Sequence, residues 1–126
     1  GVRAGKIVAL GHDLGKAERT IEAEGQLVLP GGIEAHCHIE QESSTRIMTA
    51  DDFYSGSVSA AFGGNTTFIP FAAQHRGQNL RDVIKTAHDR AGPKSVIDYA
   101  FHLIISDPTE NVLWQELPAL IMEGYS

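Results

Sequence analysis

Residues 29–41 read LPGGIEAHCHIEQ, a short apolar segment that begins with a Pro-Gly-Gly turn and ends with two histidines. If the segment is a β-strand, successive side chains point to opposite faces, so His36 and His38 share one face and Cys37 lies on the other. The two histidine Cα atoms would then be about 7 Å apart, a spacing from which both imidazoles can reach one zinc-like ion. The spacing is compatible with metal binding by His36 and His38, but an H-x-H pair is a weak motif on its own.

From residue 31 onward the chain alternates between strand-like and helix-like segments. Strands are expected at residues 31–38, 66–71 and 95–105. The last of these is nearly continuous in apolar residues, as in a parallel sheet that is covered on both faces. An amphipathic segment follows each strand, and this order is typical of parallel βαβ units and of the α/β class.

Local signals predict where the three helices begin and which faces they bury. The first helix is expected to take Thr49 as its N-cap, with Asp52 at its third position. The second is expected to start after Asn79, and the third at Asp107–Pro108, with Pro118 kinking or splitting it. The predicted buried faces are Tyr54, Ser57, Val58, Ala61 and Phe62 in the first helix and Leu80, Val83, Ile84, Ala87 and Ala91 in the second.

Residues 1–30 have the pattern of antiparallel β-structure. Residues 6–10, 20–23 and 26–29 are strand candidates, and Glu24–Gly25 is a turn signal between the last two. This part of the chain contains no catalytic motif.

Length, charge and cysteine content narrow the class of protein. A chain of 126 residues has room for one domain. The net charge of −6 argues against nucleic acid or an anionic membrane as a partner, because both require clustered Lys and Arg. Cys37 is the only cysteine, so no internal disulfide can form, and no apolar run approaches the roughly 20 residues of a membrane-spanning helix. We therefore expect a cytoplasmic protein.

The run from Pro30 to His38 resembles the first barrel strand of the cyclic amidohydrolases, most closely that of the dihydropyrimidinase and hydantoinase branch. The resemblance covers nearly the whole chain and continues through residues 49–53, 61–67, 76–78 and 96–103. Two features depart from the branch: Glu34 stands where Asp is common, and the loop at 39–48 lacks the Pro-Phe-Gly-Gly run of many hydantoinases. Both departures bear on which ring substrate is accepted.

The resemblance implies a TIM-type (β/α)8 amidohydrolase barrel, of which residues 31–126 would form the first three strand-helix units. Residues 1–30 would form part of a small β-sandwich. Because three units cannot close a barrel of eight parallel strands, we expect the chain to be truncated, with further polypeptide after Ser126. The full-length protein is expected to be a homo-oligomer.

The resemblance also implies a centre of two divalent metal ions, zinc or manganese. Hydroxide held at this centre would attack the ring carbonyl of a cyclic amide, such as a dihydropyrimidine or a 5-substituted hydantoin. His36 and His38 would supply two of the metal ligands. A carbamylated lysine, two further histidines and a catalytic aspartate would follow Ser126. The chain itself would then hold no catalytic residue, and the isolated chain is expected to be inactive.

Five further residues have weaker signals. Glu40 and Gln41 stand where a loop over the pocket begins, and they either contact the substrate or belong to a solvated loop. His75 follows the second strand and is a candidate for the mouth of the pocket. Cys37 is expected to be a small buried residue, and His102 a hydrogen-bonded structural histidine.

Other functions stay open at this stage. Some relatives in this branch are non-catalytic scaffold proteins, but such relatives tend to lose metal ligands, and this chain has both histidines. Dihydroorotases carry Arg two residues after the second histidine to hold a substrate carboxylate, where this chain has Glu40, which would repel it. Allantoinase is harder to distinguish.

Overall fold

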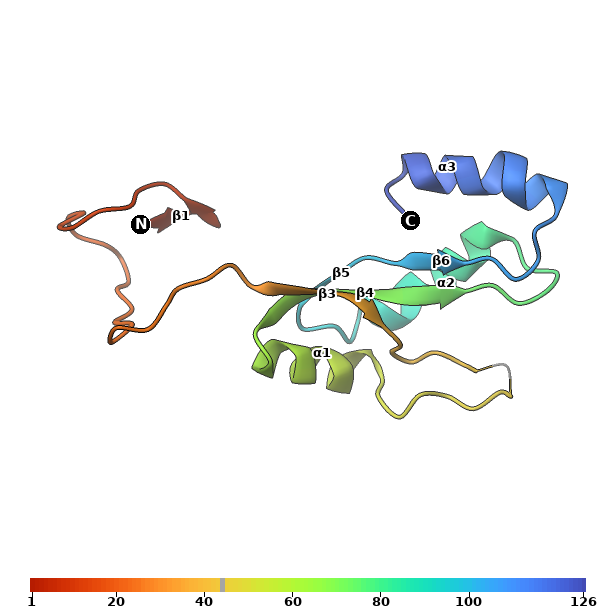
Figure 1. Cartoon of the computed structure of the whole chain (residues 1–126), viewed down its shortest axis with the longest axis horizontal. Coiled ribbons are helices and arrows are strands. Elements are labelled where there is room, and N and C mark those ends of the chain that lie inside the picture. Colours follow the sequence, from red (N-terminus) through yellow and green to blue (C-terminus); the bar gives the residue numbers. More distant parts are fainter. Residues whose placement is uncertain (44) are drawn as a thin grey trace.

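The computed structural model describes residues 1–43 and 45–126, which form an α/β unit and an N-terminal segment that extends away from it (Figure 1). In chain order the elements are the strands β1 (Val2–Arg3), β2 (Lys6–Ile7) and β3 (Gly32–Cys37), helix α1 (Phe53–Phe62), strand β4 (Asn65–Ala73), helix α2 (Leu80–Ala91), strands β5 (Asp98–Tyr99) and β6 (His102–Ile104), the π-helical turn η1 (Val112–Glu116) and helix α3 (Leu117–Met122). Across the described ranges, no helix has the length and apolar character needed to span a bilayer.

A parallel sheet lies at the centre of the fold, with β4 as its middle strand. β3 pairs with β4 on one side, and β5 and β6 follow one another along β4 on the other. All of these pairings are parallel, so the predicted βαβ order and the α/β class are confirmed. The predicted third strand is interrupted at residues 100–101, where the chain passes from β5 to β6.

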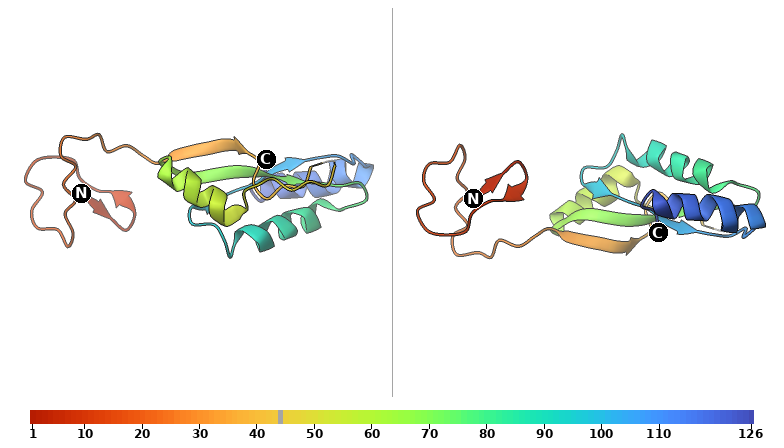
Figure 2. Two further views of the ribbon diagram at one scale, coloured as in Figure 1. Left: turned by 90° about the horizontal axis from the view of Figure 1, so that it is seen from below. Right: turned by 90° about the horizontal axis from the view of Figure 1, so that it is seen from above.

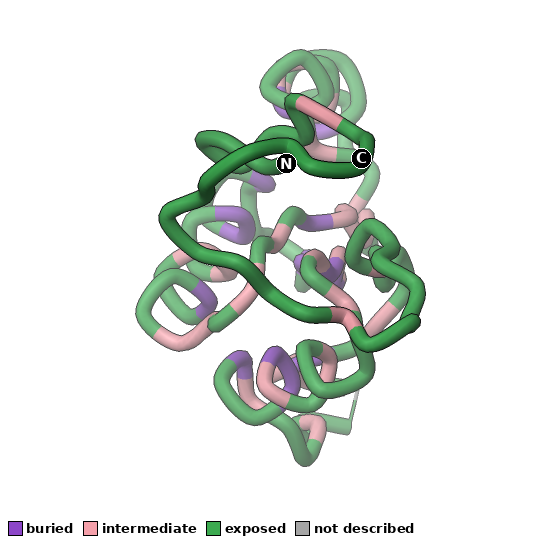
Figure 3. Tube along the Cα trace, turned by 90° about the vertical axis from the view of Figure 1, so that its left-hand side faces the viewer, coloured by how far each residue is buried: buried purple, intermediate pink, exposed green. Residues whose placement is uncertain are grey.

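The buried core lies between the sheet and the helices. Along β4, Phe68, Pro70 and Ala72 are buried, whereas the residues between them are partly open. The predicted stripe of α2 is confirmed, since Leu80, Val83, Ile84 and Ala91 are buried and Ala87 packs against them. Figure 2 shows α1 and α2 beside the strands that they cover, and Figure 3 shows the buried residues on the inner sides of the helices.

Helix α1 begins three residues later than predicted. Asp52, not Thr49, is the N-cap: its carboxylate accepts from the amide of Ser55 at 2.9 Å, and the Ser55 hydroxyl accepts from the amide of Asp52 at 3.2 Å. This reciprocal capping box satisfies two of the amides that a helix start leaves unpaired. The predicted buried face is confirmed at Ser57 but wrong at Tyr54 and Phe62, which are exposed, and α1 buries Phe53 and Gly56 instead.

Gly56 explains this shift of the buried face. A β-carbon at Gly56 would lie 2.9 Å from Cδ1 of Ile39, so the absence of a side chain lets α1 approach the residue that follows the histidine strand. The larger residues of the predicted face would hold the helix further away.

The predicted effect of Pro118 is confirmed. Pro118 lies in the first turn of α3 and has no amide hydrogen to donate to the carbonyl four residues earlier. The amide of Leu117 bonds instead to the carbonyl of Val112, five residues back, and the turn η1 is π-helical.

Residues 1–30 contain less regular structure than predicted. Only Val2–Arg3 and Lys6–Ile7 pair, and residues 8–31 form no strand. The turn at Glu24–Gly25 is present, with a hydrogen bond of 2.8 Å from the amide of Gln26 to the carbonyl of Ala23. Its flanking apolar residues stay exposed, in keeping with the marginal stability of a two-stranded hairpin that has no covering layer.

Glycine is required where the chain enters β3. A β-carbon at Gly31 would lie 2.1 Å from Cγ2 of Thr66, and Thr66 cannot yield by rotation because its own β-carbon would be only 2.7 Å away. We therefore expect Gly31→Ala to lower the free energy of unfolding by about 1–3 kcal/mol, measured by urea denaturation. Gly63→Ala is the matched control, since its nearest atom would be at 3.4 Å and its φ is negative. Equal stability of the two variants would contradict a close approach at Gly31.

Candidate metal centre

His36 and His38 lie together at the C-terminal end of β3. Their ring centroids are 5.5 Å apart, and the rings meet edge to face at 74°. Both rings contact Phe71 of the neighbouring strand β4, at centroid distances of 4.8 and 5.0 Å. The prediction that the two histidines share one face is therefore confirmed, and Phe71 is a contact that sequence reasoning missed.

The side chain of Gln41 contacts the ring of His38. Its Oε1 lies 2.7 Å from Nδ1 of His38. An amide oxygen only accepts hydrogen bonds, so Nδ1 is the donor of this contact, and in the neutral imidazole the lone pair then lies on Nε2. A hydrogen bond of this kind from the far ring nitrogen is what orients most metal-binding histidines.

Cys37 lies on the opposite side of the strand, as predicted. It packs against the hydrophobic core between the sheet and the helices. Burial, with a smaller contribution from the charge of Glu34, raises the pKa of the Cys37 thiol to about 11. The thiol is therefore protonated at neutral pH and does not offer the thiolate that a metal would need.

His102 uses both of its ring nitrogens within the protein. Nε2 donates to the carbonyl of Ala35 at 3.0 Å, and Nδ1 accepts from the Ser126 hydroxyl at 2.6 Å. The prediction of a hydrogen-bonded structural histidine is thus confirmed.

The bond from His102 falls on an irregular part of β3. The register of β3 against β4 shifts between Glu34 and Cys37, and Pro70 opposite Cys37 has no amide hydrogen to donate to β3. His102 therefore ties β3 to β6 next to this shift, directly before the first histidine of the pair.

The histidine pair could supply only part of a metal site. The described residues contain no group of three or more His, Cys, Asp or Glu side chains that could hold an ion. Zinc usually takes three or four protein ligands, so His36 and His38 fit two positions of such a site.

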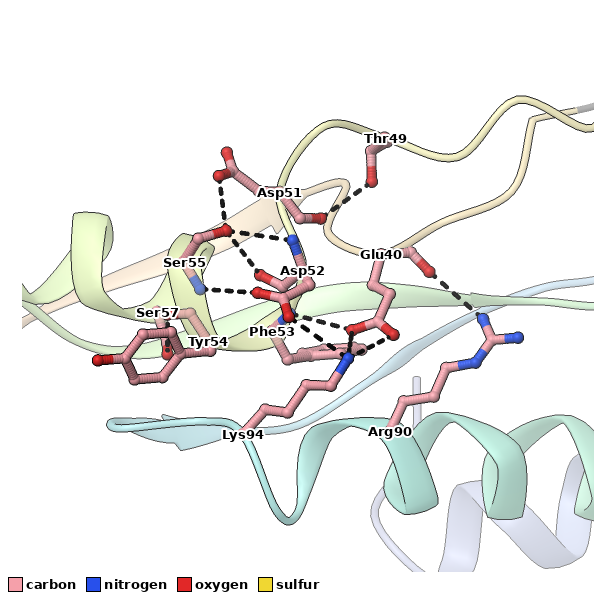
Figure 4. A network of polar contacts seen from close by, with 10 residues as sticks. All are labelled: Glu40, Thr49, Asp51, Asp52, Phe53, Tyr54, Ser55, Ser57, Arg90 and Lys94. Carbon is pink, nitrogen blue, oxygen red and sulfur yellow. Dashed lines mark hydrogen bonds and ion pairs between the residues drawn. The ribbon is translucent and has the colours of Figure 1, made fainter.

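The side chain of Glu40 points toward Lys94 and the start of α1 (Figure 4). Its two carboxylate oxygens each lie 2.8 Å from Nζ of Lys94, and one of them also accepts from the amide of Phe53 at 3.1 Å. The hydrogen bond to Glu40 raises the pKa of Lys94 above its ordinary value, so Lys94 keeps its positive charge at neutral pH. The predicted contact of Glu40 and Gln41 with a substrate stays a prediction, and the carboxylate of Glu40 is already engaged elsewhere.

A shallow cavity lies between the loop after β3 and helix α2. Its lining includes Gln41, Phe71, His75 and Arg90, but neither His36 nor His38. His75 lines this cavity, but because the cavity does not include the histidine pair, its predicted place at the mouth of the active-site pocket stays a prediction.

Comparison with known proteins gives a consistent set of relatives. No family model matches the chain. The chain is 45% identical to the D-hydantoinase of Ralstonia pickettii over 120 residues, which are 95% of this chain and 26% of that protein. A solved structure of D-hydantoinase, 44% identical, superposes on 99% of this chain and 27% of its own with a TM-score of 0.91. The chain belongs to the D-hydantoinase and dihydropyrimidinase family.

Proteins named dihydropyrimidinase also match, over a smaller share of this chain than the two hydantoinases just described. The dihydropyrimidinase of Rattus norvegicus is 36% identical over 83% of this chain and 21% of that protein. The dihydropyrimidinase structure from Brevibacillus agri covers 74% of this chain and 20% of its own, with 41% identity and a TM-score of 0.69. The chain spans about a quarter of the length of the curated hydantoinases that it matches.

Proposed function

We propose that this chain forms part of a metal-dependent hydrolase that opens cyclic amides, with hydantoins and dihydropyrimidines as the substrate class. The observation that carries the proposal is the histidine pair on one face of β3, with Oε1 of Gln41 placed at Nδ1 of His38. The family supports it, because the relatives named above are D-hydantoinases and dihydropyrimidinases.

The same proposal includes the architecture around the site. Three parallel strands with helices on one side are what the first three strand-helix units of a TIM-type barrel would look like, with residues 31–126 in the barrel and residues 1–30 in a β-sandwich. In such barrels active sites lie at the C-terminal ends of the strands, and both histidines occupy that end of β3.

His36 and His38 would hold one divalent ion, zinc or manganese, together with ligands that this chain does not supply. A divalent ion bound there polarises the ring carbonyl and lowers the pKa of the attacking water. In this proposal the residues of this chain bind the ion and orient its ligands. The imidazoles would donate their lone pairs to the ion, Gln41 contacts the ring of His38, and Phe71 packs against both rings.

The test uses a full-length hydrolase that carries this sequence. The protein is stripped of metal with a chelator, reloaded with Zn²⁺ or Mn²⁺, and assayed for ring opening of hydantoin, dihydrouracil, allantoin and dihydroorotate. We expect metal-dependent turnover of hydantoin or dihydrouracil. Turnover of allantoin alone would move the protein to the allantoinase branch, and metal binding without turnover of any ring would contradict the proposed activity.

A further inference from the structure

The loop that follows the histidine pair makes a sharp reversal at Glu40. The backbone of Glu40 has a φ of +46°, in the left-handed region that residues with a β-carbon seldom adopt. A residue stays in this region only when its surroundings hold it there. The contacts of Glu40 show what holds it.

Three parts of the chain form hydrogen bonds with Glu40 (Figure 4). Its amide donates to the carbonyl of Asp51 at 2.9 Å, and its carboxylate accepts from the amide of Phe53 at the start of α1. On the other side Lys94, three residues after the end of α2, binds both carboxylate oxygens and lies 3.4 Å from the carboxylate of Asp52. The Glu40 side chain is only 17% exposed and that of Lys94 34%, so water screens this ion pair less than one on the open surface.

The reversal at Glu40 returns the next residue toward His38. The amide of Gln41 donates to Oγ1 of Thr49 at 3.1 Å, and its carbonyl accepts from the amide of Thr49 at 3.0 Å. With its backbone held on both sides, Gln41 directs its side-chain oxygen at Nδ1 of His38. A series of contacts therefore runs from Lys94 through Glu40 and Gln41 to the ring of His38.

We propose that Glu40 and Lys94 form an ion pair that positions His38, by holding the left-handed turn from which Gln41 fixes the ring of this histidine as its Nδ1–H tautomer. Glu40 is thus a positioning residue, and its carboxylate acts from the helix side of the sheet. The inference rests on the proposed function only where it treats His38 as a metal ligand, because the turn and its hydrogen bonds exist without metal.

The first test measures the tautomer of His38 in the ¹⁵N-labelled 126-residue chain, without metal and at pH 8, by two-bond ¹H–¹⁵N correlation spectra. We expect the Nδ1–H form to predominate in the unmodified chain. Glu40→Gln keeps the size of the side chain but removes its charge, and Lys94→Met removes the cation. In both variants we expect a substantial fraction of His38 to shift to the Nε2–H form, whereas Lys94→Arg keeps the charge and should retain the original tautomer.

The matched control is Lys85→Met, which makes the same substitution at an exposed ion pair within α2, between Lys85 and Asp89. We expect no change in the His38 signals of this variant. A role in stability alone would leave the tautomer of His38 unchanged in folded Glu40→Gln and Lys94→Met chains, and that result would overturn the proposal. If Glu40→Gln does not fold, the tautomer of His38 in Lys94→Met is compared with that in Lys94→Arg, and equal tautomers in the two variants would overturn the proposal.

A second measurement separates this inference from the proposed function. In the metal-stripped full-length hydrolase, Glu40→Gln is expected to weaken Zn²⁺ binding by about 10-fold, the usual effect of losing a residue that orients a ligand. A tautomer shift without loss of Zn²⁺ affinity would support the positioning of His38 and count against its role as a metal ligand. An unchanged tautomer would overturn the positioning whether or not the protein binds metal.

Discussion

Replacement of His36 or His38 by alanine is expected to abolish metal-dependent ring opening in a full-length hydrolase that carries this sequence. Each imidazole would supply one of the few ligands of the ion, and a divalent metal contributes several kcal/mol to the stabilisation of the transition state. Loss of that contribution corresponds to a decrease in kcat/KM of about 10³-fold or more. The measurement is steady-state hydrolysis of hydantoin and dihydrouracil, together with the metal content of each purified variant.

The control for both variants is His12→Ala, the same substitution at an exposed histidine of the N-terminal segment. We expect this variant to keep its metal and its activity. Full activity of His36→Ala or His38→Ala would refute the assigned ligand role. Loss of activity with unchanged metal content would show that the two histidines act on the substrate and not on the metal.

The features that the sequence predicted well depend on residues close together in the chain. The shared face of His36 and His38 follows from the two-residue period of a strand, and the buried stripe of α2 follows from helical spacing after the cap at Asn79. The split before α3 follows from the missing amide hydrogen of Pro118. Each of these effects acts within one or two turns or strand repeats, so a local reading of the sequence captures it.

The features that the sequence did not predict depend on contacts between distant residues. Thr49 and Asp52 are both good caps, and the choice of Asp52 is made by Ser55 and by the fit of Gly56 against Ile39. Lys94 lies 54 residues after Glu40, and no local pattern joins them. Because Lys94 lies three residues after the end of α2, its side chain can contact the residues at the start of α1. This contact depends on how α1 and α2 pack together, so it is not apparent from the sequence.

The contrast between β3 and the N-terminal segment has a similar cause. Both contain apolar residues suited to strands, but β3 has β4 beside it, while residues 20–29 have no neighbouring strand among the described residues. Strand propensity mainly reflects packing against neighbouring strands. Residues 20–29 have no such neighbour in the described part of the chain, and of the predicted hairpin only the turn at Glu24–Gly25 forms.

Phe68→Ala is expected to cause the largest loss of stability in this chain. Phe68 is fully buried in the middle strand of the sheet, where its ring stacks on Phe53 of α1 at 6.2 Å and lies 6.5 Å from Tyr99 of β5. Truncation removes buried apolar area and leaves a cavity where the strand meets the helix, which costs about 3–5 kcal/mol. Urea denaturation followed by circular dichroism measures this as a lower unfolding midpoint.

The matched control is Phe62→Ala, the same substitution at the last residue of α1, where the ring is 91% exposed. Its effect should stay within about 0.5 kcal/mol, because surface changes away from caps and ion pairs are nearly neutral. A chain of this size has only about 5–15 kcal/mol of stability, so Phe68→Leu, which leaves a smaller cavity, provides a measurable intermediate if Phe68→Ala does not fold. Equal midpoints for Phe68→Ala and Phe62→Ala would mean that the contact between the sheet and α1 does not hold this fold together, and the position of the histidine pair would then need another support.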